Sequence, residues 1–260
     1  MGIFDKENEI IEYFQTIVSP PEVALIPEND ETERVFQSIF DEESWAKWTD
    51  TSGKNDPPPD FYCGEYGLMM DVMRVDDHGY ISEKGKTVNP TLTREREVTK
   101  ELQENGILGQ FPGAKLHLLV DTKLPTEEDH NYMFYRDNFV RTVEAHKKKI
   151  HRYRENHPNC KVIFFVFDES SAYMEPLRKT NNPVKGQLHC GRVHVWFNDS
   201  AFIKVLKDSD IDYLVWFTPY KMIEFLGKGL ELPRAVVYNI KELPQERFEY
   251  NEDCMMSVEV

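Results

Sequence analysis

The segment from Gly67 to Val75 constrains the fold more than any other part of the chain. Its sequence, Gly-Leu-Met-Met-Asp-Val-Met-Arg-Val, is mostly apolar and shows little of the alternation that marks a strand with one face in water. Such a strand is expected to be covered on both faces. Ionised side chains are rarely buried in this setting without a partner or a metal ion. Asp71, in the middle of the segment, is therefore the first candidate for chemistry.

Two further apolar runs end in acids. The run from Ala114 closes as Asp121-Thr-Lys123, and the run Lys161-Val-Ile-Phe-Phe-Val-Phe-Asp168 is the clearest strand in the chain. An acid next to a lysine at the end of a buried strand brings a metal ligand and a cation together. Asp121 and Lys123 therefore join Asp71 as candidate site residues. The alternative is that Asp121 only ends the strand before Leu124-Pro125 and pairs with Lys123.

The order of the expected elements predicts an α/β fold in which one mixed sheet is flanked by helices. Helical periodicity is found over residues 7–18, 31–48, 93–105, 126–156, 200–207 and 221–226. Strand patterns are found over residues 60–63, 66–75, 114–123, 161–168, 187–198, 212–218 and 235–240. No repeat or linker divides the chain, so we predict a single domain over residues 1–260, with a C-terminal α/β extension at 187–240 and an acidic tail at 241–260.

Charge and composition exclude several classes of protein. The formal net charge is −15, which disfavours broad binding of nucleic acid unless cations are concentrated locally. No run of about 18 apolar residues and no signal-peptide pattern is present, which predicts a cytoplasmic protein without a membrane partner. The four cysteines form no Cys-x-x-Cys pair, and we expect reduced, mostly structural thiols.

Common catalytic motifs are also missing. The sequence contains no Gly-x-Gly-x-x-Gly, no Walker loop, no Gly-x-Ser-x-Gly elbow and no His-Glu-x-x-His. Dinucleotide enzymes, P-loop NTPases, serine hydrolases and zincins are therefore disfavoured.

Several histidines and acids have two interpretations each. His78 follows Asp76 and Asp77, and His130 follows a Glu-Glu-Asp run at residues 127–129, so both have the chemistry of metal ligands. Acids at a loop or a helix start also simply complement the helix dipole. His189 and His194 are five residues apart in an expected strand, which places them on opposite faces and makes them a poor joint pair.

Asp168 and Glu169 end the strongest strand, a position where open α/β sheets often carry functional side chains. The same acids are equally able to cap the segment that follows.

One basic segment, His146 to Arg154, stands out in this acidic chain. Its cations spread around most of a helical wheel, which is the usual pattern of a solvated face. The same segment is also the most suitable place for a phosphate backbone to bind. The residues concerned are Lys147, Lys148, Lys149, Arg152 and Arg154.

The strand and helix order, together with the acids at Asp71 and Asp121 and the lysine at Lys123, resembles the core of the PD-(D/E)xK, or restriction-endonuclease-like, nucleases. The resemblance covers residues of about 31–168. It implies that Asp71 and Asp121 hold Mg²⁺, for which Mn²⁺ can substitute, and that Lys123 lies beside the attacking water. It also implies a metal-assisting glutamate on the first core helix, which would be Glu33 or Glu43.

A second register of the same motif is open. The literal Pro-Asp pair is Pro59-Asp60, which would make Asp60 and Asp71 the acids and place Met73 where the family has lysine. The first register predicts a metal-dependent nuclease that hydrolyses nucleic-acid phosphodiesters. The second predicts a catalytically inactive α/β module that binds or assembles with other proteins.

Overall fold

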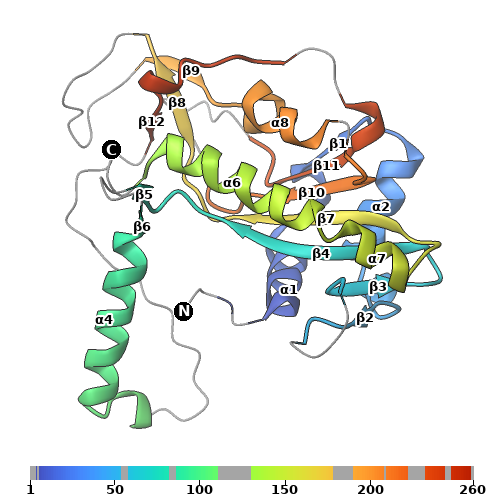
Figure 1. Ribbon diagram of the computed structural model, residues 1–260, viewed down its shortest axis with the longest axis horizontal. Coiled ribbons are helices and arrows are strands. Elements are labelled where there is room, and N and C mark those ends of the chain that lie inside the picture. The colour runs from blue at the N-terminus through green and yellow to red at the C-terminus, as the bar shows by residue number, and fades with distance from the viewer. Residues whose placement is uncertain are drawn as a thin grey trace.

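A mixed sheet of seven strands forms the centre of the protein (Figure 1). The computed structural model describes residues 4, 6–53, 58–81, 86–110, 130–177, 190–207, 209–221, 232–243 and 247–258. The strands follow the spatial order β1, β11, β10, β7, β4, β3, β2. Their bounds are Val23–Ile26 (β1), Ala235–Asn239 (β11), Tyr213–Phe217 (β10), Lys161–Asp168 (β7), Leu68–Val75 (β4), Phe61–Cys63 (β3) and Thr49–Asp50 (β2). Strands from both halves of the chain thus share one sheet.

The three strands in the middle of this sheet, β4, β7 and β10, are parallel. Val75 of β4 is paired with Asp168 of β7, and Phe167 of β7 is paired with Phe217 of β10. The flanking strands β3 and β11 run antiparallel to their central neighbours. The carboxyl ends of β4, β7 and β10 therefore lie side by side at one edge of the sheet.

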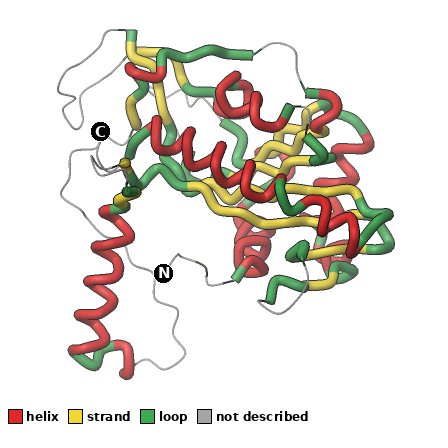
Figure 2. Tube along the Cα trace, viewed as in Figure 1, coloured by secondary structure: helices red, strands yellow, loops and turns green. Residues whose placement is uncertain are grey.

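Helices cover both faces of the sheet, which confirms the predicted α/β class (Figures 1 and 2). Helices α6 (Tyr132–Lys147), α7 (Ile150–Asn156) and α8 (Ser200–Leu206) pack on one face, and α1 (Glu7–Ile17) and α2 (Asp30–Phe40) pack on the other. Alternate side chains of β4 and β7 point to opposite faces, as strand geometry requires. Both faces of these strands are apolar because both are covered.

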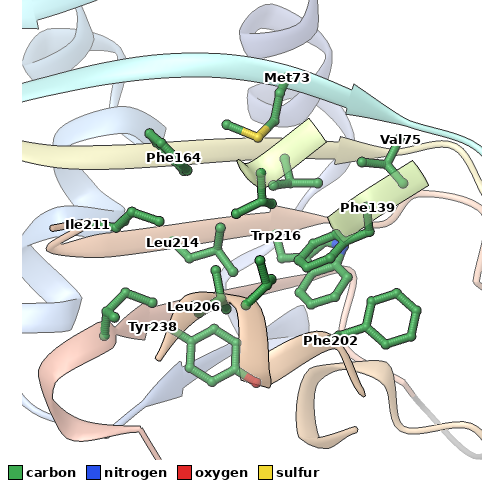
Figure 3. Packing of buried hydrophobic residues seen from close by; sticks show 14 of the residues in the cluster. Met73, Val75, Phe139, Phe164, Phe202, Leu206, Ile211, Leu214, Trp216 and Tyr238 are labelled. Carbon is green, nitrogen blue, oxygen red and sulfur yellow. The ribbon is translucent and has the colours of Figure 1, made fainter. Parts of the chain in front are cut away.

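Aromatic contacts dominate the two cores. On the α6 face, Phe139 stacks on Trp216 with ring centroids 4.4 Å apart, and Phe202 of α8 packs beside them (Figure 3). On the α1 face, Phe14 meets Phe165 edge-on, with 5.4 Å between ring centroids. Each core fixes its helices against the parallel strands that carry the polar edge described below.

The remaining elements lie outside the main sheet. They comprise α3 (Glu42–Trp45), α4 (Pro90–Glu104), the hairpin of β5 (Tyr80–Ile81) and β6 (Thr87–Val88), and a small sheet of β12 (Met256–Ser257), β8 (Tyr173–Pro176) and β9 (Gly191–Val193). Short 3-10 turns span Pro20–Glu22, Leu108–Gln110, Trp196–Asn198, Ile240–Glu242 and Glu252–Cys254. Helix α4 extends away from the main sheet (Figure 1).

Several predicted elements differ from the structure. The helix predicted over 31–48 is broken at Asp41, whose backbone is extended and whose carboxylate accepts the Ser44 N–H at 2.8 Å, so that α3 starts there. The long helix is divided at Lys148 and Lys149 into α6 and α7. The strand predicted over 187–198 is limited, in its described part, to Gly191–Val193, because a 3-10 turn begins at Trp196.

Strand β1 was not predicted at all, because its four residues lie between two proline-containing turns. The predicted strand over 114–123 and most of the predicted helix near 221–226 lie outside the described residues.

Candidate functional site

Polar side chains gather where the three parallel strands end. Asp76, Asp77 and His78 follow β4, the segment Asp168–Ser171 ends and follows β7, and Lys221 lies four residues after β10. Asp77, Asp168, Ser170 and Lys221 are buried. Ligands of open α/β sheets bind outside the carboxyl ends of parallel strands. This carboxyl edge is therefore the first place to look for chemistry.

A potential metal site lies at this edge. Asp77 and His78 come from the end of β4, and His130 comes from the segment that enters α6. One ligand atom from each of the three side chains lies within 4.8 Å of the other two. The Nδ1 atom of His130 is 3.2 Å from both carboxylate oxygens of Asp77, and the Nδ1 atom of His78 is 3.9 Å from Oδ1. Among the described residues, this is the one group of three such side chains with ligand atoms this close.

The backbone holds the three residues in place. The carbonyl oxygen of Asp77 accepts the N–H of Gly79 at 2.9 Å and the N–H of Asn131 at 3.1 Å. Gly79 packs under the ring of Phe134 so closely that a Cβ atom there would lie 2.7 Å from the ring. A side chain at position 79 would therefore displace the Phe134 ring, so glycine favours the close approach of this segment to the first turn of α6. This approach is what brings His130 beside Asp77.

Hydrogen bonds from β8 and from the segment before it orient the Asp77 carboxylate. Its Oδ2 atom accepts the Ser171 N–H at 3.0 Å, the Ser171 hydroxyl at 2.9 Å and the Tyr173 hydroxyl at 2.6 Å. Burial alone would raise the pKa of the Asp77 carboxyl, but the hydrogen bond and charge of His130, the charge of His78 and the Tyr173 hydroxyl hold this pKa well below its usual range. Asp77 is therefore ionised and oriented throughout the physiological pH range.

A second buried carboxylate, Asp168, lies beside this group on β7. Its Oδ2 atom accepts the Tyr135 hydroxyl at 2.6 Å and the Trp216 Nε1–H at 2.9 Å, and the Lys221 ammonium is 3.5 Å away. Lys221 also donates to the Ser171 carbonyl at 2.9 Å. The Lys221 and Asp168 side chains are 1% and 0% exposed, so the two groups form a buried ion pair at this edge.

Two further carboxyls at this edge have a raised pKa. Burial raises the pKa of Glu169 to about 7 and that of Asp76 to about 6, and the neighbouring acids add to both effects. The Glu169 N–H donates to the Val75 carbonyl at 2.8 Å, which places Glu169 beside the end of β4. Carboxyls of this kind exchange protons near neutral pH, as general acids and bases must.

The structure places Asp71 in the middle of β4, buried and facing α6 and α7. It accepts hydrogen bonds from the Tyr153 hydroxyl at 2.6 Å and from the Nδ1 atom of His146. Asp60, just before β3, lies against it and accepts the Val72 N–H at 2.8 Å. Burial and the charge of Asp71 raise the pKa of Asp60 to about 7, so Asp60 binds a proton below neutral pH. Asp60 and Asp71 therefore meet as the second register of the motif requires, and Met73, in the lysine position, is buried.

The other predicted site residues are separated from Asp71 or lie beyond the description. Asp121 and Lys123 lie outside the described residues. Glu33 is exposed on α2, on the opposite face of the sheet from α6, where it accepts a hydrogen bond from Gln37 at 2.7 Å and lines a cleft of about 700 Å³. Glu43 is exposed on α3. Within its described part, the structure does not bring Glu33 or Glu43 to Asp71.

Some cations of the basic segment donate hydrogen bonds to other protein groups, and the others are exposed to solvent. Lys147 donates to Glu144 at 2.7 Å and to the Val205 carbonyl at 3.0 Å, and Arg154 donates to the Asp210 carbonyl at 2.8 Å. The Lys147 contact also brings the basic end of α8 to the end of α6, a juxtaposition that the sequence did not indicate. The exposed cations of this basic surface are Lys148, Lys149, Arg152, Lys204 and Lys207.

The sequence did not predict that two of the histidines would meet. The sequence indicates His78 and His130 as two separate candidates, each beside its own acids, and the fold brings both to the Asp77 carboxylate. The signal was present in the two acids and the histidine directly after a buried strand. His194 is a buried structural residue whose Nε2 atom lies 2.8 Å from Asp199, and His189 lies outside the described residues.

Comparison with known proteins identifies no relative: no protein-family model, curated protein or solved structure matches the chain. None of the described helices has the length and apolar character needed to cross a membrane.

Proposed function

We propose that the protein is a divalent-metal-dependent hydrolase of nucleic-acid phosphodiesters whose reaction centre is the carboxyl edge of β4 and β7. The observation that carries this proposal is the convergence of Asp77, His78 and His130. A divalent ion held there would lower the pKa of a bound water and polarise a phosphoryl oxygen. These are the two requirements for hydrolysing a phosphodiester at neutral pH.

The protein's own groups would supply the proton chemistry. Glu169 and Asp76 lie at the same edge, and the pKa of each is near neutral, so both can accept a proton around pH 7. Asp168 and Lys221 lie beneath them as a buried ion pair that fixes the β7 end. Water activation and proton transfer therefore fall within one short stretch of the sheet edge.

The basic surface supplies a place for the substrate backbone. Lys148, Lys149 and Arg152 lie at the far end of α6 from His130, and Lys204 and Lys207 extend the surface onto α8. Helix α6 has 16 residues and is thus about 24 Å long. A substrate that touches both ends must be a strand of several nucleotides. The acidic carboxyl edge would repel it unless a metal ion offset the charge.

The test is a cleavage assay with fluorescent single- and double-stranded DNA and RNA in the presence of Mg²⁺, Mn²⁺ or Zn²⁺. Asp77→Asn is expected to reduce the rate by about 100-fold or more, because it removes an anionic ligand. Asp253→Asn, an exposed carboxylate in a 3-10 turn, is the matched control and should leave the rate unchanged. Equal rates for wild type and Asp77→Asn would contradict the proposal.

Binding can be separated from cleavage by measuring oligonucleotide affinity in the Asp77→Asn background. Lys148→Gln with Lys149→Gln is expected to lower the slope of log Kd against log salt by about 2, because two phosphate contacts are lost. Lys100→Gln, on the remote helix α4, is the control. An unchanged slope would show that the nucleic acid does not lie on this surface.

A second candidate function rests on the Asp60 and Asp71 pair. Both carboxyls are occupied by protein groups, and Met73 stands where a nuclease of the resembled family has lysine. This arrangement favours a catalytically inactive module that binds or assembles with other proteins. The Mg²⁺ site of the first register is tested separately by Asp121→Ala, which would abolish stabilisation by Mg²⁺ if Asp121 were a ligand.

A further inference from the structure

We infer that Asp77, His78 and His130 form a site for a zinc-class transition-metal ion, not for Mg²⁺. This inference rests on the proposed function in assigning a metal to the carboxyl edge, and it adds the class of the ion. The three side chains would supply two imidazole nitrogens and one carboxylate oxygen. They would leave a position open for water or substrate.

The donor atoms decide the class of ion. Mg²⁺ takes oxygen ligands in octahedral geometry and seldom accepts imidazole. Zn²⁺, Co²⁺ and Fe²⁺ bind imidazole readily, and a catalytic zinc site has three protein ligands with an open fourth position. Two histidines and one aspartate match that composition. In the described part of the chain, the group of close ligand atoms contains a single carboxylate, that of Asp77.

The spacing of the ligand atoms is close to that of a tetrahedral site. Two ligands at about 2.1 Å from a tetrahedral ion lie about 3.4 Å from each other. The His130 nitrogen is 3.2 Å from the Asp77 carboxylate, and the His78 nitrogen is 3.9 Å from it. The His78 side chain is 25% exposed, whereas the Asp77 side chain is fully buried. To complete a tetrahedral set, the His78 nitrogen would move closer to Asp77 than its present 3.9 Å.

Hydrogen bonds hold the Asp77 carboxylate in one orientation, as is usual for a metal ligand. Three hydrogen bonds, two from Ser171 and one from Tyr173, converge on Oδ2. The Ser171 hydroxyl is in turn 2.9 Å from the hydroxyl of Ser257 on β12. These contacts fix the plane of the carboxylate, whose two oxygens are both 3.2 Å from His130 Nδ1 and whose Oδ1 is 3.9 Å from His78 Nδ1. Outer hydrogen bonds of this kind orient metal ligands, and their loss weakens affinity by about 10- to 100-fold.

The experiment is a titration of the full-length metal-free protein with Co²⁺, read from its visible absorption bands, followed by displacement with Zn²⁺. It is done in a Cys190→Ser, Cys254→Ser background, because these two thiols are at least partly accessible and would also bind these ions. We expect one equivalent of Co²⁺ to give intense bands that Zn²⁺ removes. The melting temperature should rise with micromolar Zn²⁺ and not with millimolar Mg²⁺.

Variants locate the site. His78→Ala and His130→Ala are expected to weaken Co²⁺ binding by about 100-fold or more, and Tyr173→Phe by about 10-fold. His151→Ala, an exposed histidine on α7, is the matched control. Because His78 is partly exposed and not part of the core, His78→Ala keeps the test informative if a buried variant fails to fold.

Either of two results would overturn the inference: Co²⁺ bands that are absent or persist unchanged in His78→Ala and His130→Ala, or stabilisation by Mg²⁺ that is lost in Asp77→Asn. The inference and the proposed function fail independently. Tight Co²⁺ binding without cleavage of any nucleic acid would refute the proposed function and support the metal site. Mg²⁺-dependent cleavage that is unaffected by His78→Ala would support the nuclease function and refute the zinc-class site.

Discussion

Replacing Asp60 with asparagine should stabilise the protein at alkaline pH and not at acid pH. In the wild type, the protonated Asp60 carboxyl lies against Asp71 and accepts the Val72 N–H at 2.8 Å. An asparagine side chain has the same shape, can donate its NH₂ group to Asp71 and can accept the Val72 N–H. It therefore imitates the protonated acid and removes the ionisation.

The magnitude follows from the pKa of Asp60. Burial and the Asp71 charge raise this pKa from its ordinary 3.8 to about 7, so the folded state holds more protons than the unfolded state between these values. Wild-type stability from this group therefore falls as the pH rises through that window, and it is constant outside it. At about 1.4 kcal/mol per pKa unit, the whole effect is about 4 kcal/mol. Asp60 keeps some contact with solvent, which screens the charge, so we expect about 2 kcal/mol.

The assay is urea denaturation of wild type and Asp60→Asn at about pH 4.5 and about pH 8. The difference between the two proteins cancels the other groups that titrate in this range. Asp60→Asn should gain about 2 kcal/mol over wild type on going from the lower to the higher pH. A difference that is the same at both pH values would show that the pKa of Asp60 is not raised in the folded state, and the reasoning would be refuted.

Three other substitutions test the packing and the buried charges, each by its urea midpoint. Asp168→Ala should lower the free energy of unfolding by at least about 3 kcal/mol, because it leaves the buried charge of Lys221 without its carboxylate. The double variant with Lys221→Met should lose less stability than the sum of the two single variants. Strictly additive losses would argue against the ion pair. Phe139→Ala should cost about 3 to 5 kcal/mol, since it removes the ring that stacks on Trp216, and a cost below about 1 kcal/mol would mean that the α6 core is loosely packed. Asn29→Ala should cost about 1 kcal/mol through loss of two N-cap hydrogen bonds of 3.0 Å at α2, whereas no change would mean that water replaces the cap.

The apolar strands of the sheet were the most predictable part of the fold. The predicted strand Lys161–Asp168 matches β7 at both ends, and residues 212–218 contain β10 within one residue at each end. These runs have one interpretation because six or more consecutive buried positions need cover on both sides. Strand β1 has only four half-buried residues, and its partner β11 lies more than 200 positions away, so nothing local identifies it.

The site was less predictable than the fold, for a physical reason. Asp71 was visible because an acid within a buried strand is unusual, whereas Asp77 was noted only as a neighbour of His78 with possible ligand chemistry. Their partners come from elsewhere in the chain: His146 and Tyr153 reach Asp71 from α6 and α7, and Tyr173 reaches Asp77 from β8. Which tyrosine or histidine meets which acid depends on helix packing and crossover length. No pattern in a single sequence records either.

Tyrosine hydroxyls hold several of the buried carboxylates of this protein. Four of them each donate to a buried acid: Tyr132 to Asp199, Tyr135 to Asp168, Tyr153 to Asp71 and Tyr173 to Asp77. Burial and the adjacent negative charge raise the pKa of all four phenols well above the usual value. They stay neutral for as long as the protein is folded. In an alkaline spectrophotometric titration, the tyrosinate absorbance of these four residues should therefore appear only as the chain unfolds, at a higher pH than that of solvent-accessible tyrosines, and it would report the loss of the native state.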